Sequence, residues 1–405
     1  MIYSEALAWL YGTQRFGIKL GLENVQRLLR ELKVPSANQR IIHVAGTNGK
    51  GSVCAMIDSI CRAAGYRTGL FISPHLVTYR ERIRVNGEMI TPDEVASGLT
   101  AIRDLIEAWD PHPTFFEITT ALALVHFKKS ECELIVLETG LGGRLDATNA
   151  LTPVVSVITP IGLDHEKWLG HTLEAIAAEK AGIIKAKVPV VSAQQNPPAE
   201  KVVRSRAAQC NAPLEFVAAV CDRRWNVALA GNHQQQNAML AVAALQAGKI
   251  AVADEAITRG LATVDWPARF QRWDDRTIID GAHNPSGADV LAETWRERFG
   301  ADRATIILAV LREKDVSAIC RALAPIAARF VLPGIRSERA LPPEELAPHL
   351  ATLGLPSSIA ASFADALESA RAQADPILIT GSLHFAGEAL AFLSGNPGAL
   401  EDCAQ

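Results

Sequence analysis

Residues 46–52 (G-T-N-G-K-G-S) place three glycines, a lysine and a serine between an apolar run and a stretch of helical periodicity. Glycines let the backbone wrap closely around a phosphate, and the amides at a helix start point at its negative charge. Lys50 would reach the terminal phosphates, and the Ser52 hydroxyl would contact a Mg²⁺ ion. The pattern is a variant of G-x-x-x-x-G-K-[ST], because position 44 is Val44 and Gly51 separates Lys50 from Ser52. A glycine-rich turn that binds nothing is the alternative, but the strand, lysine and helix in register favour ATP or GTP.

Three further side chains stand where predicted strands end. Ser73 and Glu138 close the apolar runs at 68–73 and 133–138, and His165 lies just past the run at 154–159. Open α/β sheets place their ligands at the carboxyl ends of strands, and oxygen ligands suit Mg²⁺, although a histidine is unusual for so hard an ion. Taken singly, Glu138 could also be a helix-capping carboxylate and His165 a hydrogen-bonded turn residue.

Lys180 lies within an otherwise apolar helical stretch, A-I-A-A-E-K-A-G-I-I, so its amine is expected to point into the site. Desolvation lowers a lysine pKa and frees the amine as a nucleophile toward CO₂. The alternative is a lysine that extends along the surface and keeps its charge in water.

The elements that must position these residues alternate along the chain. Strands are predicted at 40–45, 68–73, 133–138, 154–159 and 188–192, and helices at 52–64, 115–129, 173–185 and 237–247. Apolar strands separated by helices indicate a parallel sheet that is covered on both faces. Residues 196–230 are less regular and could hold extra strands or a covering subdomain.

Trp266-Pro267 marks a candidate domain boundary, because the strand–helix alternation restarts beyond it. The predicted strands there are 277–280, 304–310, 330–333 and 376–380, and the predicted helices are 288–299, 316–328, 343–350 and 363–374. We therefore expect an α/β protein with a domain at 1–266 and a smaller, Rossmann-like domain at 267–405.

Composition limits the classes of function. The 405 residues are 49% apolar and 21% charged with a net charge of −4, so neither a nucleic acid nor a membrane surface would be bound through a broad charge field. Seven cysteines form no C-x-x-C pair, and the odd number favours a reducing compartment. No apolar stretch of membrane-spanning length and no signal-peptide pattern occur, so a cytoplasmic protein is expected.

The phosphate loop resembles that of the Mur ligase superfamily, and other segments narrow the resemblance to the folylpolyglutamate synthase/dihydrofolate synthase family. The most distinctive segment is E-T-G-L-G-G-R-L-D-A-T-N at 138–149. The others, in the order of the family, are 17–22, 73–76, 81–83, 115–117, 163–165, 169–170, 179–185, 266–269, 280–285 and 380–383. They extend from near the N-terminus almost to the end of the chain.

The resemblance implies a P-loop ATPase domain of the Mur ligase type and a C-terminal glutamate ligase domain. It implies that L-glutamate is joined to the carboxylate of dihydropteroate or of a folyl-polyglutamate, by way of an acyl phosphate formed with ATP. The implied catalytic residues are Lys50, His165 and Lys180. ATP would be bound by Asn48, Gly49, Lys50, Gly51, Ser52, Asn237, Arg269 and Asp280. Two Mg²⁺ ions would be held by Ser52, Ser73, Glu138, His165 and Lys180, the last as a carbamate.

The implied pterin or folate residues are Phe116, Glu117 and Asp146, and the implied glutamate residues are His283 and Ser382. Two adjacent phenylalanines in a helix are also common in a core. Asn237 could instead be a plain helix cap, and Arg269 could form a salt bridge in the linker. The resemblance favours a monomer that acts on small molecules only.

Several alternatives stay open at this level. Some family members only extend folates, whereas the intact 142–149 run resembles the bifunctional bacterial members. A nucleotide-hydrolysing switch protein would fit the phosphate loop, but the N-K-x-D-like motif of a guanine reader is absent. A cell-wall Mur enzyme would usually carry a further N-terminal domain, for which the 45 residues before Gly46 leave no room. A pseudoenzyme is disfavoured because Lys50, Glu138, His165 and Lys180 are all present.

Overall fold

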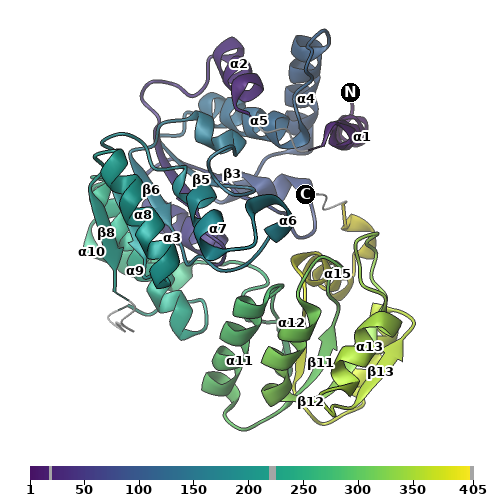
Figure 1. Cartoon of the computed structure of the whole chain (residues 1–405). Coiled ribbons are helices and arrows are strands. Elements are labelled where there is room, and N and C mark those ends of the chain that lie inside the picture. The colour runs from purple at the N-terminus through teal and green to yellow at the C-terminus, as the bar shows by residue number, and fades with distance from the viewer. Residues whose placement is uncertain (18–20, 219–224, 402–405) are drawn as a thin grey trace.

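The chain forms two mostly parallel sheets, each flanked by helices (Figure 1). The structure, a computed structural model, describes residues 1–17, 21–218 and 225–401. Residues 18–20 of the predicted motif at 17–22 and residues 219–224 of the irregular stretch at 196–230 lie outside the described residues. The predicted α/β class with two layered units is confirmed.

The first sheet has eight strands in the order β4-β3-β2-β5-β1-β6-β7-β8. The six strands from β2 to β8 in that order are parallel, and β3 and β4 are added antiparallel at one edge. The strands are β1 Arg40–Ala45, β2 Thr68–Phe71, β3 Ile83–Val85, β4 Glu88–Met89, β5 Leu134–Glu138, β6 Val155–Ile158, β7 Val190–Ala193 and β8 Leu214–Val217.

Helices cover both faces of this sheet because successive strand residues point to opposite sides. In β1, Ile42 and Val44 pack beneath α3, α9 and α10, whereas Ile41 packs beneath α1, α2, α4 and α5. Helices α7 and α8 cover β6 and β7. The helices are α1 Tyr3–Gly12, α2 Glu23–Leu32, α3 Lys50–Ala63, α4 Pro92–Ile106, α5 Phe115–Lys129, α6 Glu166–Leu169, α7 Leu173–Ala181, α8 Pro197–Gln209, α9 Asn232–Ala247 and α10 Asp254–Thr263. Short 3₁₀ turns are η1 Thr13–Phe16, η2 Tyr79–Arg82 and η3 Ala147–Ala150.

The second sheet has six strands in the order β13-β12-β11-β14-β10-β9, and only β9 is antiparallel to its neighbour. Helices α11 to α13 pack on one face, and α14 and α15 pack on the other. The strands are β9 Gln271–Arg272, β10 Thr277–Ile279, β11 Ala304–Leu308, β12 Ala327–Pro333, β13 Ser357–Ala360 and β14 Ile377–Thr380. The helices are α11 Pro285–Phe299, α12 Val316–Leu323, α13 Pro343–Ala351, α14 Phe363–Arg371 and α15 Leu383–Leu393, with 3₁₀ turns η4 Ala324–Ile326 and η5 Pro397–Ala399.

Several predicted boundaries are wrong. The helix predicted at 316–328 ends at Leu323, because Pro325 lies in the 3₁₀ turn that leads into β12. The helix predicted at 173–185 ends at Ala181, and the helix predicted from residue 237 begins at Asn232. In the stretch at 196–230, β8 adds a further parallel strand to the first sheet, and α8 packs against that sheet. The alternative of extra strands is therefore confirmed, and that of a separate covering subdomain is wrong for the described part of this stretch.

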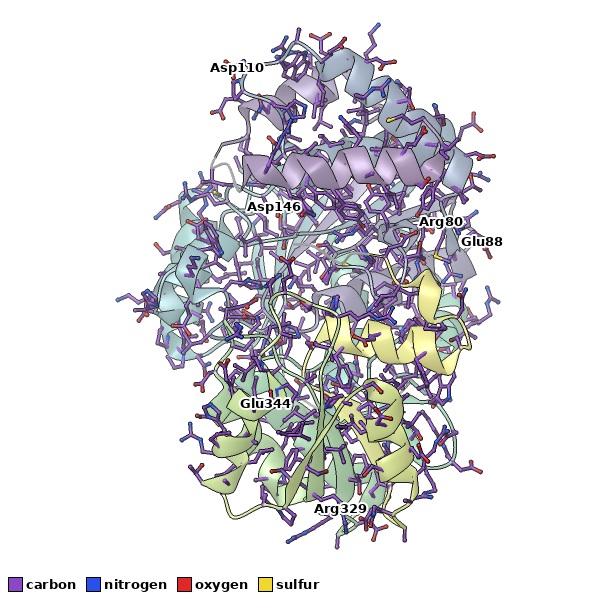
Figure 2. The ribbon with its side chains drawn as sticks, turned by 90° about the vertical axis from the view of Figure 1, so that its right-hand side faces the viewer. Arg80, Glu88, Asp110, Asp146, Arg329 and Glu344 are labelled. Atoms are coloured by element: carbon purple, nitrogen blue, oxygen red, sulfur yellow. The ribbon has the colours of Figure 1, made fainter. Side chains whose placement is uncertain are left out.

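Each sheet with its helices forms one domain, and the two domains are in contact where α15 packs against the loop after β2. We call this contact the seam. Helix α15, yellow in Figure 2, lies along the boundary between the two halves. Leu76 and Val77 of the loop pack against the core beneath α14 and α15, and the backbone of Gly387 in α15 approaches the carbonyl oxygen of Leu76. The change from the first sheet to the second falls between α10 and β9, where Trp266-Pro267 lies. Among the described residues, no helix has the length and apolarity that crossing a membrane requires.

Candidate active site

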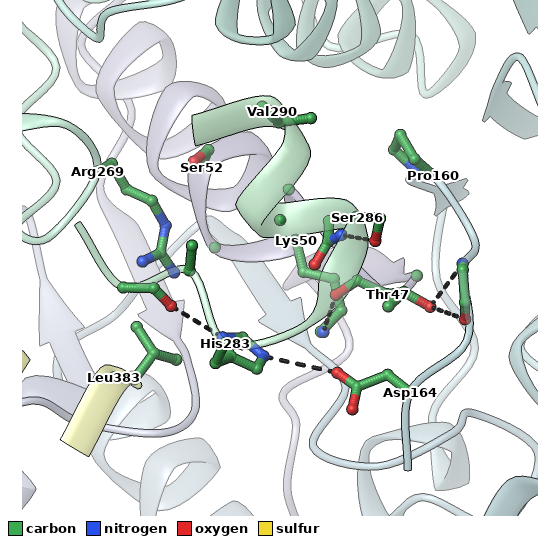
Figure 3. A pocket seen from close by; sticks show the side chains of 18 of the residues that line it. Thr47, Lys50, Ser52, Pro160, Asp164, Arg269, His283, Ser286, Val290 and Leu383 are labelled. Carbon is green, nitrogen blue, oxygen red and sulfur yellow. Dashed lines mark hydrogen bonds and ion pairs between the residues drawn. The ribbon is translucent and has the colours of Figure 1, made fainter. Parts of the chain in front are cut away.

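A cavity of about 580 Å³ lies at the carboxyl ends of the first sheet's parallel strands, and residues of the second domain line its other side. Both domains therefore contribute side chains to one site, part of which Figure 3 shows. Fourteen of the predicted site residues line it: Asn48, Gly49, Lys50, Gly51, Ser52, Ser73, Glu138, His165, Lys180, Asn237, Arg269, Asp280, His283 and Ser382.

The phosphate loop connects β1 to α3 and takes a shape that its glycines permit. Gly49 has φ of 86°, and a side chain at Gly46 would overlap Thr159. The amides of Thr47 and Asn48 donate to the Pro160 carbonyl, at 2.9 and 3.2 Å, which fixes the loop against the end of β6. Helix α3 then begins at Lys50 with no side-chain cap, so its first amides are left for a ligand.

Two lysines face each other across this loop. Lys50 Nζ donates to the Thr47 carbonyl at 3.2 Å, and Lys180 Nζ donates to the Gly46 carbonyl at 2.7 Å. Lys180 is only 4% exposed. Burial, reinforced by the charge of Lys50, lowers the pKa of Lys180 to about 7. The alternative of a solvent-extended lysine is therefore wrong, and a large fraction of the amine is neutral near pH 7.

The predicted metal ligands Ser73 and Glu138 lie side by side. The Ser73 amide donates to Glu138 Oε2 at 3.2 Å, and the buried Ser73 hydroxyl has no hydrogen-bond partner in the described part of the chain. Burial raises the pKa of the Glu138 carboxyl, and the charge of Lys50 opposes this rise. Burial also lowers the pKa of His165 to about 4, so its imidazole is neutral and able to act as a ligand at neutral pH.

These donors fit Mg²⁺, because a buried carboxylate and a buried hydroxyl without a hydrogen-bond partner are oxygen ligands of the kind this ion prefers. Residues 1–17, 21–218 and 225–401 contain no group of three His, Cys, Asp or Glu side chains arranged to hold a metal ion. Mg²⁺ commonly keeps several water ligands and is bound through one or two carboxylates, so it does not need such a group.

Asn237, Arg269 and Asp280 line the same cavity as the phosphate loop. The Asn237 side-chain oxygen packs against Gly49, and its amide donates to Gln234 at 3.0 Å. Because α9 begins at Asn232, Asn237 is not a helix cap. Asp280 accepts the amides of Phe270 and Ala282, both at 2.8 Å. Burial raises its pKa, and the charge of Arg269 opposes the rise.

The two predicted glutamate residues lie on the second domain's side of the cavity. Ser382 caps α15, since its hydroxyl accepts the Phe385 amide at 3.0 Å. His283 Nδ1 lies 2.9 Å from the Gly281 carbonyl, and its Nε2 lies 3.5 Å from Asp164 of the first domain (Figure 3).

The three predicted pterin residues do not line the cavity. Glu117 forms a capping box with Thr114 at the start of α5, and the Phe116 ring packs against Gly140 and Phe71. Asp146 accepts the amides of Gly140 and Leu141 on one oxygen, and the amide and hydroxyl of Thr148 on the other. The carboxylate of Asp146 therefore shapes the loop after β5, and a direct contact with substrate stays a prediction.

Comparison with known proteins decides the family. Residues 44–216 match the Mur ligase middle domain, and residues 268–383 match the Mur ligase glutamate ligase domain. The dihydrofolate synthase/folylpolyglutamate synthase of Bacillus subtilis is 36% identical, over 95% of this chain and 97% of its own. The protein belongs to the folylpolyglutamate synthase/dihydrofolate synthase family. The Escherichia coli relative of the same name is 34% identical, over 93% of this chain and 92% of its own.

Solved structures of the family have the same fold. A Mycobacterium tuberculosis folylpolyglutamate synthase complexed with ADP superposes with a TM-score of 0.88 at 32% identity, over 99% of this chain and all of the other. An Escherichia coli structure in complex with DHPP and ADP gives a TM-score of 0.86 at 31% identity, over 96% and 98% of the two chains. The present chain is thus an enzyme of the ATP-dependent ligase class, and the predicted family and fold are confirmed.

Sequence reasoning assigned no role to three residues that also line the cavity, Asp164, Gln234 and Lys314. Asp164, whose side chain is 7% exposed, joins the two domains through Lys314 Nζ at 2.5 Å. Burial would raise the pKa of Asp164, but His283, His165 and Lys314 outweigh it and hold that pKa well below its usual range. Gln234 donates to the Ser52 hydroxyl at 3.3 Å. The L-D-H run at 163–165 was a signal for Asp164, whereas nothing local indicated Lys314 or Gln234.

Proposed function

We propose that this protein joins L-glutamate to the carboxylate of dihydropteroate or of a (tetrahydro)folyl-polyglutamate in folate biosynthesis, with cleavage of ATP to ADP and phosphate. The observation that carries this proposal is the shared cavity. In it the phosphate loop of one domain faces His283 and Ser382 of the other. An enzyme that must hold a nucleotide and an amino acid close together gains from such a two-sided site, because proximity lowers the barrier to reaction.

The reaction has two steps. The acceptor carboxylate attacks the γ-phosphorus of ATP, which gives an acyl phosphate and ADP. The glutamate amine then attacks the acyl carbon, loses a proton, and phosphate leaves as the amide forms. Both partners of the first step are negative, so the site needs positive charge and fixed donors rather than a covalent nucleophile. Lys50, Arg269 and the first amides of α3 supply them.

Closing the second domain over the phosphate loop would exclude water from the acyl phosphate. His283 and Ser382 would orient the incoming glutamate, and Asn237, Arg269 and Asp280 would hold the nucleotide. Each of these five side chains lines the cavity, which supports the assignment.

ATP and a divalent cation are the cofactors that this site fits. Mg²⁺, when bound, neutralises charge on the phosphates and on the attacking carboxylate. We assign two ions to Ser52, Ser73, Glu138, His165 and a carbamylated Lys180. The lowered pKa of Lys180 supports the carbamate, because only a neutral amine adds to CO₂. A related structure from Yersinia pestis was solved with AMPPNP and a manganese ion, which supports a divalent cation here.

We assign both dihydrofolate synthase and folylpolyglutamate synthase activity to this chain. Relatives from Bacillus subtilis and Escherichia coli carry both names, whereas a Lacticaseibacillus casei relative, 33% identical, is named a folylpolyglutamate synthase alone. Folylpolyglutamate synthase activity alone is therefore the alternative. We further propose that the protein is a monomer in the cytoplasm that acts on small molecules only and binds neither nucleic acid nor membrane.

The test is acceptor-dependent phosphate release with ATP, Mg²⁺ and glutamate. Dihydropteroate and tetrahydrofolate should each stimulate release, and a UDP-muramyl acceptor should not. Stimulation by tetrahydrofolate alone would favour the single-activity alternative. Stimulation by none of the three would refute the proposed function.

A further inference from the structure

The phosphate loop touches the second domain directly, through the side chain of Asn48. Its amide donates to the Ser286 hydroxyl at 2.8 Å and to Asn284 Oδ1 at 3.3 Å, and Asn284 donates back to Asn48 Oδ1 at 3.0 Å. Asn284 and Ser286 lie at the start of α11 (Ser286 is labelled in Figure 3). The loop that would hold the nucleotide phosphates is therefore fastened to the opposite domain.

Asn284 uses all of its hydrogen-bonding capacity at this contact, and it is 1% exposed. One amide hydrogen goes to Asn48 and the other to Asp164 Oδ2, at 3.1 Å. Its oxygen caps α11 by accepting the Gly287 amide at 2.8 Å. Only a side chain with two donors and an acceptor on one planar group satisfies these partners, and among residues of this size that is asparagine.

Asp164 extends the contact into a network that bridges the domains. Besides Asn284, it holds Lys314 Nζ of the second domain at 2.5 Å, and its carboxylate lies 3.5 Å from His283. The side chains of Asp164 and Lys314 are 7% and 8% exposed. An ion pair so buried tolerates little displacement, because separating the partners leaves an uncompensated charge. The network thus fixes His283 relative to the phosphate loop.

We propose that Asn284 is a positioning residue that couples the phosphate loop to the glutamate-binding half through Asn48 and Asp164. This inference rests on the proposed function. Asn284 contacts no reacting atom; it sets the separation between the bound phosphates and the incoming amine. When the coupling is lost, acyl phosphate still forms, but water attacks it more often. That reaction returns the acceptor carboxylate and inorganic phosphate without an amide.

The variant that tests this is Asn284→Asp. It keeps the size of the side chain and the oxygen that caps α11, but it replaces both amide donors by a carboxylate oxygen facing Asp164 and Asn48. We expect the ratio of phosphate released to amide formed to rise about ten-fold, and we expect the KM for glutamate to rise as well. ADP affinity should stay close to the wild-type value, because the loop backbone is held by Pro160 rather than by Asn284.

Ser362→Ala is the matched control, because it removes a helix cap, that of α14, in the same domain, away from the cavity-lining residues. It should lower the melting temperature without changing the ratio. If Asn284→Asp does not fold, Ser286→Ala, which removes one bond to Asn48, should shift the ratio in the same direction by a smaller factor.

A wild-type ratio in a folded Asn284→Asp enzyme would overturn the proposal, and so would an equal rise in Ser362→Ala. An unchanged ratio in Ser286→Ala would overturn it where Asn284→Asp does not fold. Failure of the wild-type enzyme to form any amide would instead count against the proposed function, so the two failures are distinguishable.

Discussion

Gly387 gives the sharpest test of whether the seam between the domains must be rigid. It lies in α15, five residues after Ser382, and a Cβ there would stand 1.9 Å from the carbonyl oxygen of Leu76. Ordinary contact needs 3.4 Å, so in Gly387→Ala one backbone must retreat by about 1.5 Å. The obstacle is backbone, which no change of rotamer relieves.

The displacement is transmitted to the site because the loop that carries Leu76 is stiff. Glu81 accepts the amides of Leu76, Val77 and Thr78, at 2.8 to 2.9 Å, and Ser73 begins the same loop. Either Ser73 or Ser382 must therefore move relative to the other. A misplacement of about 1 Å costs on the order of 10²-fold in rate, so kcat should fall by about that factor.

The free energy of unfolding should fall only modestly, because two effects of the substitution partly cancel. Alanine gains up to about 1 kcal/mol over glycine in a helix, which offsets part of an overpacking cost of about 1–3 kcal/mol. The assay is steady-state amide formation at saturating ATP, with thermal melting measured alongside. Gly98→Ala in α4 is the control, because its Cβ would meet only the end of the flexible Leu122 side chain. Wild-type kcat in Gly387→Ala, or an equal loss in Gly98→Ala, would refute a rigid seam.

Three further predictions concern single side chains. Lys180→Ala should lower turnover by at least about 10²-fold and recover part of it with formate or acetate, which replace the anionic carbamate; unchanged turnover would contradict the carbamate. Ser73→Ala should leave the melting temperature equal or higher, since an unpartnered buried hydroxyl is removed, yet raise the Mg²⁺ concentration needed for half-maximal rate. An unchanged Mg²⁺ requirement would argue against Ser73 as a ligand. Burial lowers the pKa of His43 to about 3. As the pH falls, this histidine is therefore protonated in the unfolded chain, near pH 6.5, before it is protonated in the folded one, and the free energy of unfolding decreases from about that pH downward. Between pH 7.5 and 5.5 this residue lowers the free energy of unfolding by about 1.4 kcal/mol. Urea unfolding of His43→Gln at these two pH values should therefore show a smaller decrease than the wild-type protein does.

The phosphate loop and the residues at strand ends could be predicted because their signals are local. Glycines beside Lys50 indicate a phosphate loop, and the carboxyl ends of parallel strands converge at one edge, so Ser73 and Glu138 must come close together. The phosphate loop, Ser73, Glu138 and His165 line one cavity for this reason. The apolar surroundings of Lys180 likewise indicated its burial from sequence alone.

Contacts across the seam could not be predicted in the same way. Asp164 and Lys314 are 150 positions apart, and the bonds between Asn48 and Asn284 span 236. Local patterns of apolar and polar residues predict helices and strands, but they do not predict which residues of two domains come into contact. The resemblance located Asp146 in a family motif, but only the structure shows that both its oxygens are bound by the loop after β5. Helix ends were also misplaced where a 3₁₀ turn intervened, as at Leu323.

The measurement that tests the central claim most directly is the mass of the product. Purified protein, ATP, Mg²⁺, L-glutamate and dihydropteroate or tetrahydrofolate would be incubated together, and acceptor mass and phosphate would be followed in the same sample. We predict that the acceptor gains one glutamate minus one water for each phosphate released. Phosphate release with no gain in acceptor mass, for either acceptor, would contradict the assignment of this cavity as the site of glutamate ligation.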